Sequence, residues 1–275
     1  MDLKHSFTFG GVNTANYGIF ISGEGVYNSP ERDVTMLTVP GRNGQLTIDN
    51  GRFENIEVTY PCFVEAGTGA TDISARIRAF RNAVGSLTGY QRLEDTYHSD
   101  EYREGIFRAG LEITPVVYHT GGEFEITFDC KPQRWLNSGE VPITLTPGQD
   151  DSGGLGLGVE MINPTEFNAA PLFKVYGGHG KIIISCDNGG VWPVYDVDIS
   201  SGTTYTAPPL YADGEILDAY EIDLGSIVSH NADVAFGSAD PSGRVYLMPS
   251  SIYTNWVWVP PSITAVDMIP RWWRI

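Results

Sequence analysis

Apolar residues recur at every second position over much of this chain, which restricts those segments to β-strands with one buried face. In residues 56–62 isoleucine, valine, tyrosine and cysteine alternate with glutamate, threonine and proline, and in residues 124–128 phenylalanine and isoleucine alternate with glutamate and threonine. The 32 glycines and 17 prolines supply the turns that many short strands need. The pattern predicts a mainly β protein.

One segment has a different period. From residue 73 onward apolar residues are spaced by three and four positions, which predicts an amphipathic helix packed on a sheet. Thr71 or Asp72 is placed to cap it. Its arginines, Arg76, Arg78 and Arg81, lie mostly off the apolar stripe, and we expect them to face solvent or a neighbouring subunit. The stripe consists of Ile73, Ile77, Phe80, Val84 and Leu87.

The sequence pattern changes near Trp135, where a turn-rich stretch and short β-type runs begin. A length of 275 residues also suits two domains. We expect a domain of α+β character at residues 1–135, a β-sandwich with one helix, and an antiparallel β-sandwich or jelly roll at residues 136–275. Residues 144–158 are polar and turn-rich. The strands expected beyond them are residues 173–176, 181–185, 192–199, 221–224, 244–248, 256–259 and 263–269.

Residues 34–48 predict a β-hairpin, because β-forming residues flank a turn cluster that contains Pro-Gly and Asn-Gly. Both faces of the hairpin carry apolar residues, which a two-stranded ribbon in water does not support. We expect one face to pack on its own domain and the other on a neighbouring copy; the alternative is that both arms pack within the subunit. The candidate interface residues are Val34, Met36, Leu37, Val39, Leu46 and Ile48, with Pro40, Gly41, Arg42, Asn43 and Gly44 shaping the tip.

Charge and motifs argue against several functions. Seventeen basic and 34 acidic residues give a formal net charge of −17, which disfavours nucleic acid or an anionic membrane as the main ligand. No apolar run is long enough to span a bilayer, so no membrane insertion is expected. The sequence lacks HExxH, GxSxG and phosphate-loop motifs, and its histidines are scattered. We therefore expect no enzymatic activity, no metal and no cofactor.

Cys62, Cys130 and Cys186 are odd in number and far apart in the sequence. This spacing gives no disulfide framework and no zinc motif, so we expect reduced, mostly buried thiols.

Tryptophans in the second half of the chain are compatible with sugar binding. Trp192, Trp256 and Trp258 either fill the sandwich core, which is the commoner use of tryptophan, or line a groove that binds sugar. The alternative function is therefore a carbohydrate-binding module that contacts cell-surface glycans.

An ordered series of short motifs resembles the distal tail proteins of long-tailed, non-contractile phages. The series covers nearly the whole chain, although residues 200–262 match nothing within it. The motifs are residues 7–13 (FTFGGVN), 17–19 (YGI), 39–44 (VPGRNG), 129–135 (DCKPQRW), 163–165 (NPT), 170–177 (APLFKVYG) and 270–275 (PRWWRI).

This resemblance implies a virion structural protein, made in the bacterial host cytoplasm and placed at the distal end of the tail. It implies a homo-hexameric ring built by the amino-terminal domain, with each hairpin reaching its neighbour, and a galectin-like carboxy-terminal sandwich. The implied partners are the tail tube protein, a tail-associated protein and a receptor-binding protein. DNA would pass through the lumen without specific binding, past acidic walls; the alternative is that the acidity serves solubility alone.

Overall fold

The computed structural model describes residues 4–65, 73–115, 121–148, 158–175, 180–187, 194–199, 220–223, 247–263 and 265–275. The chain divides into two compact units, residues 1–134 with Ile275, and residues 135–274. Each unit is described by itself below.

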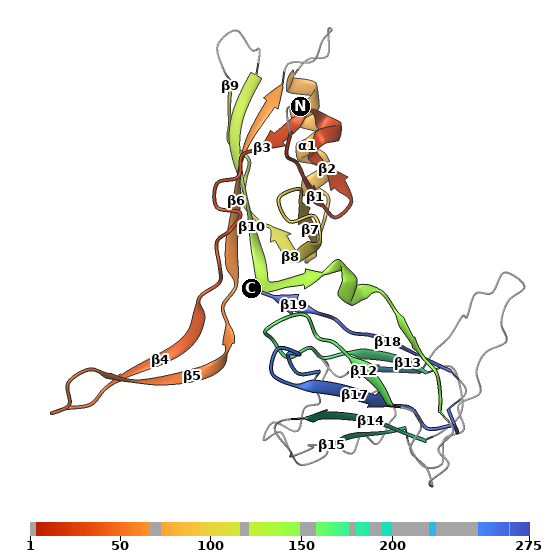
Figure 1. Cartoon of the computed structure of the whole chain (residues 1–275). Coiled ribbons are helices and arrows are strands. Elements are labelled where there is room, and N and C mark those ends of the chain that lie inside the picture. Colours follow the sequence, from red (N-terminus) through yellow and green to blue (C-terminus); the bar gives the residue numbers. More distant parts are fainter. Residues whose placement is uncertain are drawn as a thin grey trace, which may run out of the picture. The chain divides into compact units, whose positions relative to one another are not determined.

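An antiparallel sheet forms the first unit (Figure 1), with strand order β2-β1-β7-β8-β10-β6-β3 and β9 paired with β10. Strand β6 pairs with β10 along its whole length, from Ile56 opposite Cys130 to Glu65 opposite Gly121. The strands are β1 (Phe7–Phe9), β2 (Val12–Asn13), β3 (Ile19–Ile21), β6 (Ile56–Glu65), β7 (Gln91–Asp95), β8 (Glu101–Phe107), β9 (Ile113–Pro115) and β10 (Gly121–Leu136), the last of which crosses the unit boundary. A 3-10 turn, η1 (Thr14–Tyr17), links β2 to β3.

The α-helix of this unit, α1 (Ile73–Gly85), confirms the predicted amphipathic helix. Phe80 and Val84 are fully buried against the sheet, and Ile73, Ile77 and Leu87 pack around them. The ring of Phe80 lies near those of Phe7, Tyr17 and Phe124. The proposed caps, Thr71 and Asp72, lie outside the described residues.

The alternation predicted for residues 56–62 is confirmed in β6, whose side chains are alternately buried and more exposed along the strand. The buried set packs with β1 and β10 in one apolar core. The aromatic rings of Phe7, Tyr60 and Phe128 stack or meet edge-on within it.

Two four-stranded antiparallel sheets, β11-β18-β13-β16 and β12-β17-β14-β15, make up the second unit. Their apolar side chains meet in one core, with Phe173 and Met268 from one sheet and Ile184 and Val257 from the other. The strands of these sheets are β11 (Ile143–Leu145), β12 (Gly158–Met161), β13 (Leu172–Val175), β14 (Gly180–Asp187), β15 (Val194–Ile199), β16 (Tyr220–Asp223), β17 (Thr254–Trp258) and β18 (Val266–Ile269). The short strand β19 (Trp273–Arg274) pairs with β10, and a 3-10 turn, η3 (Asn137–Glu140), follows β10.

The mainly β fold class is confirmed, with one α-helix among the described residues. The predicted strands of the second half correspond to β13–β18, except that residues 244–246 and 192–193 lie outside the described part and Leu247 forms an isolated bridge with Ala169. Strands β11 and β12 were not predicted, because both are short and border the turn-rich segment 144–158.

Candidate functional site

A hairpin of β4 (Arg32–Thr38) and β5 (Gln45–Phe53) stands apart from the sheet of the first unit (Figure 1). Among the described residues the two strands pair with each other and with no other strand. The six candidate interface side chains expose between 38% and 53% of their surface. Large apolar side chains are normally covered, so this hairpin presents an unpartnered apolar surface.

Its two faces are unequal. Opposed residues of an antiparallel pair share a face, so Leu37 lies with its partner Leu46, and Ile48 lies on the same side opposite Thr35. The other face carries Val34 and Met36 among polar partners, and the Thr47 hydroxyl lies 3.2 Å from the Met36 sulfur. The face with the paired leucines is therefore the more apolar one.

The expectation that one face of the hairpin packs on its own domain is wrong, and so is the alternative that both arms pack within the subunit. Nearly every residue of β4 and β5 is exposed, so neither face packs on the sheet of the first unit, and the hairpin pairs with no other described strand.

The turn lies where the Pro-Gly and Asn-Gly cluster predicted it. The backbone N–H of Arg42 donates to the Val39 carbonyl at 3.2 Å, and Gly41 and Gly44 adopt φ of 79° and 80°. These left-handed conformations are the reason for glycine here, since nothing lies within 4 Å of a Cβ added at either position. Arg42 is the single charged residue between Val34 and Ile48.

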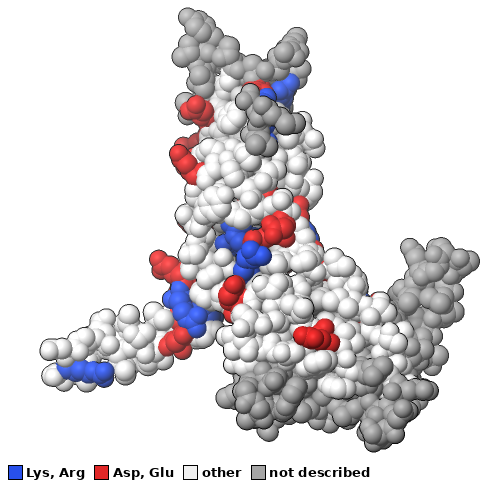
Figure 2. Space-filling view, in the orientation of Figure 1, with Lys and Arg blue, Asp and Glu red and all other residues white. Residues whose placement is uncertain are grey.

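Charges of both signs gather at the other end of the hairpin, near the sheet. Arg32 pairs with Asp49 at 2.7 Å and Arg52 with Asp33 at 2.6 Å. A hydrogen bond from Asn50, followed by that from Arg52, lowers the pKa of Asp33. Figure 2 shows this clustering at the base, an uncharged shaft and a basic tip.

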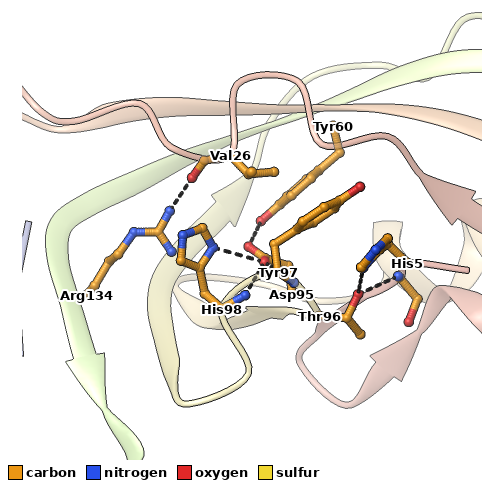
Figure 3. Close-up of polar contacts among 9 residues, drawn as sticks. His5, Val26, Tyr60, Asp95, Thr96, Tyr97, His98 and Arg134 are labelled. Carbon is orange, nitrogen blue, oxygen red and sulfur yellow. Dashed lines mark hydrogen bonds and ion pairs between the residues drawn. The ribbon is translucent and has the colours of Figure 1, made fainter. Parts of the chain in front are cut away.

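The loop between β3 and β4, which leads into the hairpin, is fastened by a buried group. Val26 is 1% exposed, and its carbonyl accepts a hydrogen bond from Nη2 of Arg134 at 2.6 Å (Figure 3). Arg134 is itself buried near the end of β10. The root of the hairpin is thus tied to a central strand.

Asp95 organises the polar groups beside this root (Figure 3). Its Oδ2 accepts from the Tyr60 hydroxyl at 2.9 Å, and its Oδ1 accepts from the backbone N–H groups of Tyr97 and His98, both at 3.0 Å. Burial, followed by the nearby Asp95 charge, raises the pKa of Tyr60 well above its usual value. The hydroxyl therefore keeps its proton and donates a hydrogen bond to Asp95.

Sequence reasoning missed these anchoring residues. The turn after Asp95 has a local signal, because an aspartate that bonds backbone N–H groups two and three residues ahead makes an Asx-type turn. The Arg134 contact has none, since its partner lies 108 residues away.

Trp256 and Trp258 do not fill the sandwich core. Val257 and Asn255 point into it, and Trp256 and Trp258 lie half-buried on the opposite face of β17 with ring centroids 6.4 Å apart. Gly158 lies beneath the Trp258 ring, which a Cβ there would approach to 2.8 Å. The core interpretation is therefore wrong for these two residues, and Trp192 lies outside the described part of the chain.

Further features of the described residues concern membrane spans, metal ligands and cysteines. No described helix is long and apolar enough to cross a membrane. No group of three or more histidine, cysteine, aspartate or glutamate side chains gathers there in a way that would hold a metal ion. Cys62 and Cys130 are free, buried thiols.

The sequence matches no family model and no curated protein. Among solved structures, the chain is similar to the Dit (gp 19.1) protein of SPP1, described as a paradigm of the hub adsorption apparatus in phages that infect Gram-positive hosts, with a TM-score of 0.60 and 11% identity over 96% of this chain and 97% of that chain. Chains of the phage P2 baseplate in its activated conformation, one with Ca and one with Sr, align over 96% of both chains at 10% identity, with TM-scores of 0.46 and 0.43. The likeness to the SPP1 protein spans nearly the whole chain, so this protein has the fold of a Dit protein.

Proposed function

We propose that this protein is a structural hub of a phage tail tip, whose copies join through the β4–β5 hairpin into a ring. One observation carries the proposal: the hairpin exposes apolar side chains on both faces and has no partner among the described residues of its own chain. The fold shared with SPP1 Dit, a hub protein by its description, supports the same role. The work of such a protein is assembly, with no bond made or broken.

Burial of the hairpin on another copy favours assembly. Covering about 400 Å² of apolar surface contributes on the order of 10 kcal/mol before the costs of ordering and association. The paired leucines, Leu37 and Leu46, hold the centre of this surface, and the polar shaft residues form its rim.

A hairpin that docks on a different part of the next copy makes a head-to-tail contact, and such contacts close into a ring when the rotation per subunit divides a full turn. Six copies are the number implied by the resemblance to distal tail proteins. In that role the ring joins the tail tube protein to a tail-associated protein, with a receptor-binding protein as a further partner. The strongly acidic chain suits a conduit, because acidic walls do not hold DNA.

The test is the mass of the purified protein and its appearance in electron micrographs. We expect annular particles of about six times 30.1 kDa from the wild type, and monomers from a Leu37→Asp/Leu46→Asp variant with an unchanged circular dichroism spectrum. An Ile162→Asp/Ile252→Asp variant is the matched control, since both side chains are exposed outside the hairpin. A wild type that is monomeric at every concentration, or a hairpin variant that assembles like the wild type, would refute the proposal.

Location in the virion provides an independent test. Antibodies against the protein should label the distal tail end of purified particles, and label elsewhere or none at all would contradict a tail-tip role.

A second candidate function rests on the half-buried pair Trp256 and Trp258. Neighbouring aromatic rings on the outer face of a sheet can stack on sugar rings. Glycan-array binding that is lost in both Trp256→Ala and Trp258→Ala, with the fold intact, would support a carbohydrate-binding module; an array without signal would count against it.

A further inference from the structure

A groove of about 790 Å³ lies on the outer face of the first unit, where β6 and β10 run side by side. The register places Glu123 opposite Phe63 and Glu125 opposite Pro61, so these residues share that face. Phe63 is 40% exposed, and Glu112 lines the groove from the loop before β9. The groove therefore combines an exposed aromatic surface with acidic side chains.

These acidic side chains lack a basic partner among the described residues. Glu112, Glu123 and Glu125 form no ion pair among the described residues, whereas neighbouring acids do: Asp129 pairs with Arg108, and Glu65 with Lys4. Carboxylates beside an apolar surface favour a ligand that is both basic and apolar.

The tip of the hairpin has that chemistry. Arg42 is exposed and makes no ion pair within the described part of the chain, and Val39 and Pro40 beside it are exposed apolar residues. We infer that the groove receives the hairpin tip of a neighbouring copy, with Arg42 between Glu123 and Glu125 and with Val39 and Pro40 against Phe63. This inference rests on the proposed function and names the surface on which the hairpin docks.

The tip that fills the groove belongs to another copy. The hairpin leaves the sheet next to Ile56, at the start of β6, whereas the groove is lined by residues 61–63 towards its other end. Strand β5 extends for about 30 Å, at ~3.4 Å per residue, and Figure 1 shows it running away from the end of the sheet that carries β9. An extended hairpin therefore points away from its own groove.

A second acidic groove lies at the base of the hairpin and provides a control. It has a volume of about 570 Å³ and is lined by Glu31, Glu54 and Glu57. Its apolar lining residues, Pro30 and Ile56, are buried, so it offers charge without an exposed apolar surface.

Charge-reversal variants test which of the two acidic grooves receives the hairpin tip. We expect Arg42→Glu alone and Glu123→Arg/Glu125→Arg alone to raise the concentration at half-assembly by roughly tenfold or more, because each places like charges together. The chain that carries all three substitutions should recover assembly, since the pairing is restored with opposite signs. Glu54→Arg/Glu57→Arg makes the same charge change at the second groove and should leave assembly near that of the wild type.

Cysteine crosslinking reports the contact directly. In a Cys186→Ser background, Asn43→Cys combined with Glu125→Cys should give disulfide-linked oligomers under mild oxidation, whereas Asn43→Cys with Glu54→Cys should give few. Both native thiols of the first unit are buried, so they do not compete.

The outcomes distinguish this inference from the proposed function. Loss of assembly in Leu37→Asp/Leu46→Asp, together with normal assembly in all the groove variants and no crosslink at residue 125, overturns the docking site and leaves the hub intact. Rescue of Arg42→Glu by Glu54→Arg/Glu57→Arg overturns it in favour of the second groove. A wild type that never assembles overturns both.

Discussion

Arg134 donates a hydrogen bond to the carbonyl oxygen of Val26, and this contact ties the end of a central strand to the loop that leads into the hairpin. Both residues are buried, so the guanidinium serves the carbonyl as a hydrogen-bond partner in place of water. The hairpin can therefore stand free of the sheet while its root stays fixed. A fixed root gives the exposed arm a defined direction, which the proposed assembly with a second copy requires.

Substitution of Arg134 should destabilise the first unit. Arg134→Met keeps the length of the side chain and leaves a buried carbonyl unsatisfied, which we expect to cost about 2–4 kcal/mol in the free energy of unfolding. Urea denaturation followed by circular dichroism measures it, with the exposed Arg78→Met as control. Equal losses in the two variants would show that the contact with Val26 contributes little.

The features that could be predicted from sequence depend on residues close together in the chain. The stripe that starts at Ile73 predicted α1, and alternation predicted β6, because both patterns are read within a few positions. The turn at residues 40–44 was equally visible, since Gly41 and Gly44 supply the backbone conformations it needs.

Features that depend on distant partners could not be predicted. The Arg134 contact joins a strand to a loop 108 residues away, and the bond from Tyr60 to Asp95 joins two strands whose order in the sheet has no local signal. The same holds for the hairpin: its apolar residues were identified, but whether anything covers them depends on the path of the rest of the chain. For Trp256, alternation showed which residues share its face and left open which face meets the core.

Burial makes the thiols of the first unit resistant to modification. It raises the pKa of Cys62 and of Cys130 from an ordinary value near 9.0 to about 12, so almost no thiolate exists at neutral pH. In a Cys186→Ser background at pH 8, Ellman's reagent should label neither thiol in the native protein and both in denaturant. Rapid labelling of the native protein would contradict their burial.

The same pKa values predict a loss of stability in alkali. The folded chain keeps both thiol protons as pH rises from 9 towards 12, whereas the unfolded chain releases them. The stability that the two protonated thiols contribute is therefore fully present below pH 9 and is lost as the pH rises above 9. At pH 10.5 the loss amounts to roughly 2 kcal/mol for each thiol, at about 1.4 kcal/mol per pKa unit. Urea denaturation at pH 8 and pH 10.5 measures this loss, and Cys130→Ala should show a shallower decline. A stability that does not change over this interval would rule the mechanism out.

Gly139 is required by close packing in the second unit. A methyl group there would overlap the backbone nitrogen of Trp272, and backbone cannot move aside as a flexible side chain can. Gly139→Ala should therefore destabilise this unit by about 1–3 kcal/mol and lower the midpoint of its tryptophan-fluorescence transition. Gly110→Ala is the control, because nothing lies within 4 Å of a Cβ at that position. A Gly139→Ala variant as stable as this control would show that the turn can shift.

Hydrogen exchange should separate the hairpin from the sheet. A two-stranded ribbon without a covered face is marginally stable in water, so the amides of β4 and β5 open locally at a cost of no more than about 2 kcal/mol. The amides shared by β6 and β10 exchange through unfolding of the whole unit, at a cost of about 5–15 kcal/mol.

In the monomeric Leu37→Asp/Leu46→Asp variant we therefore expect residues 34–48 to exchange at least about a hundredfold faster than residues 56–62. In the assembled wild type the same hairpin amides should become protected, because docking on a second copy couples their opening to dissociation. Strong protection of the hairpin in the monomer would mean that contacts within one chain stabilise it, and fast exchange in the assembly would mean that the ring is held by another surface. Protection of the hairpin amides that appears only on assembly would show that contacts with a second copy, and not contacts within one chain, stabilise the hairpin.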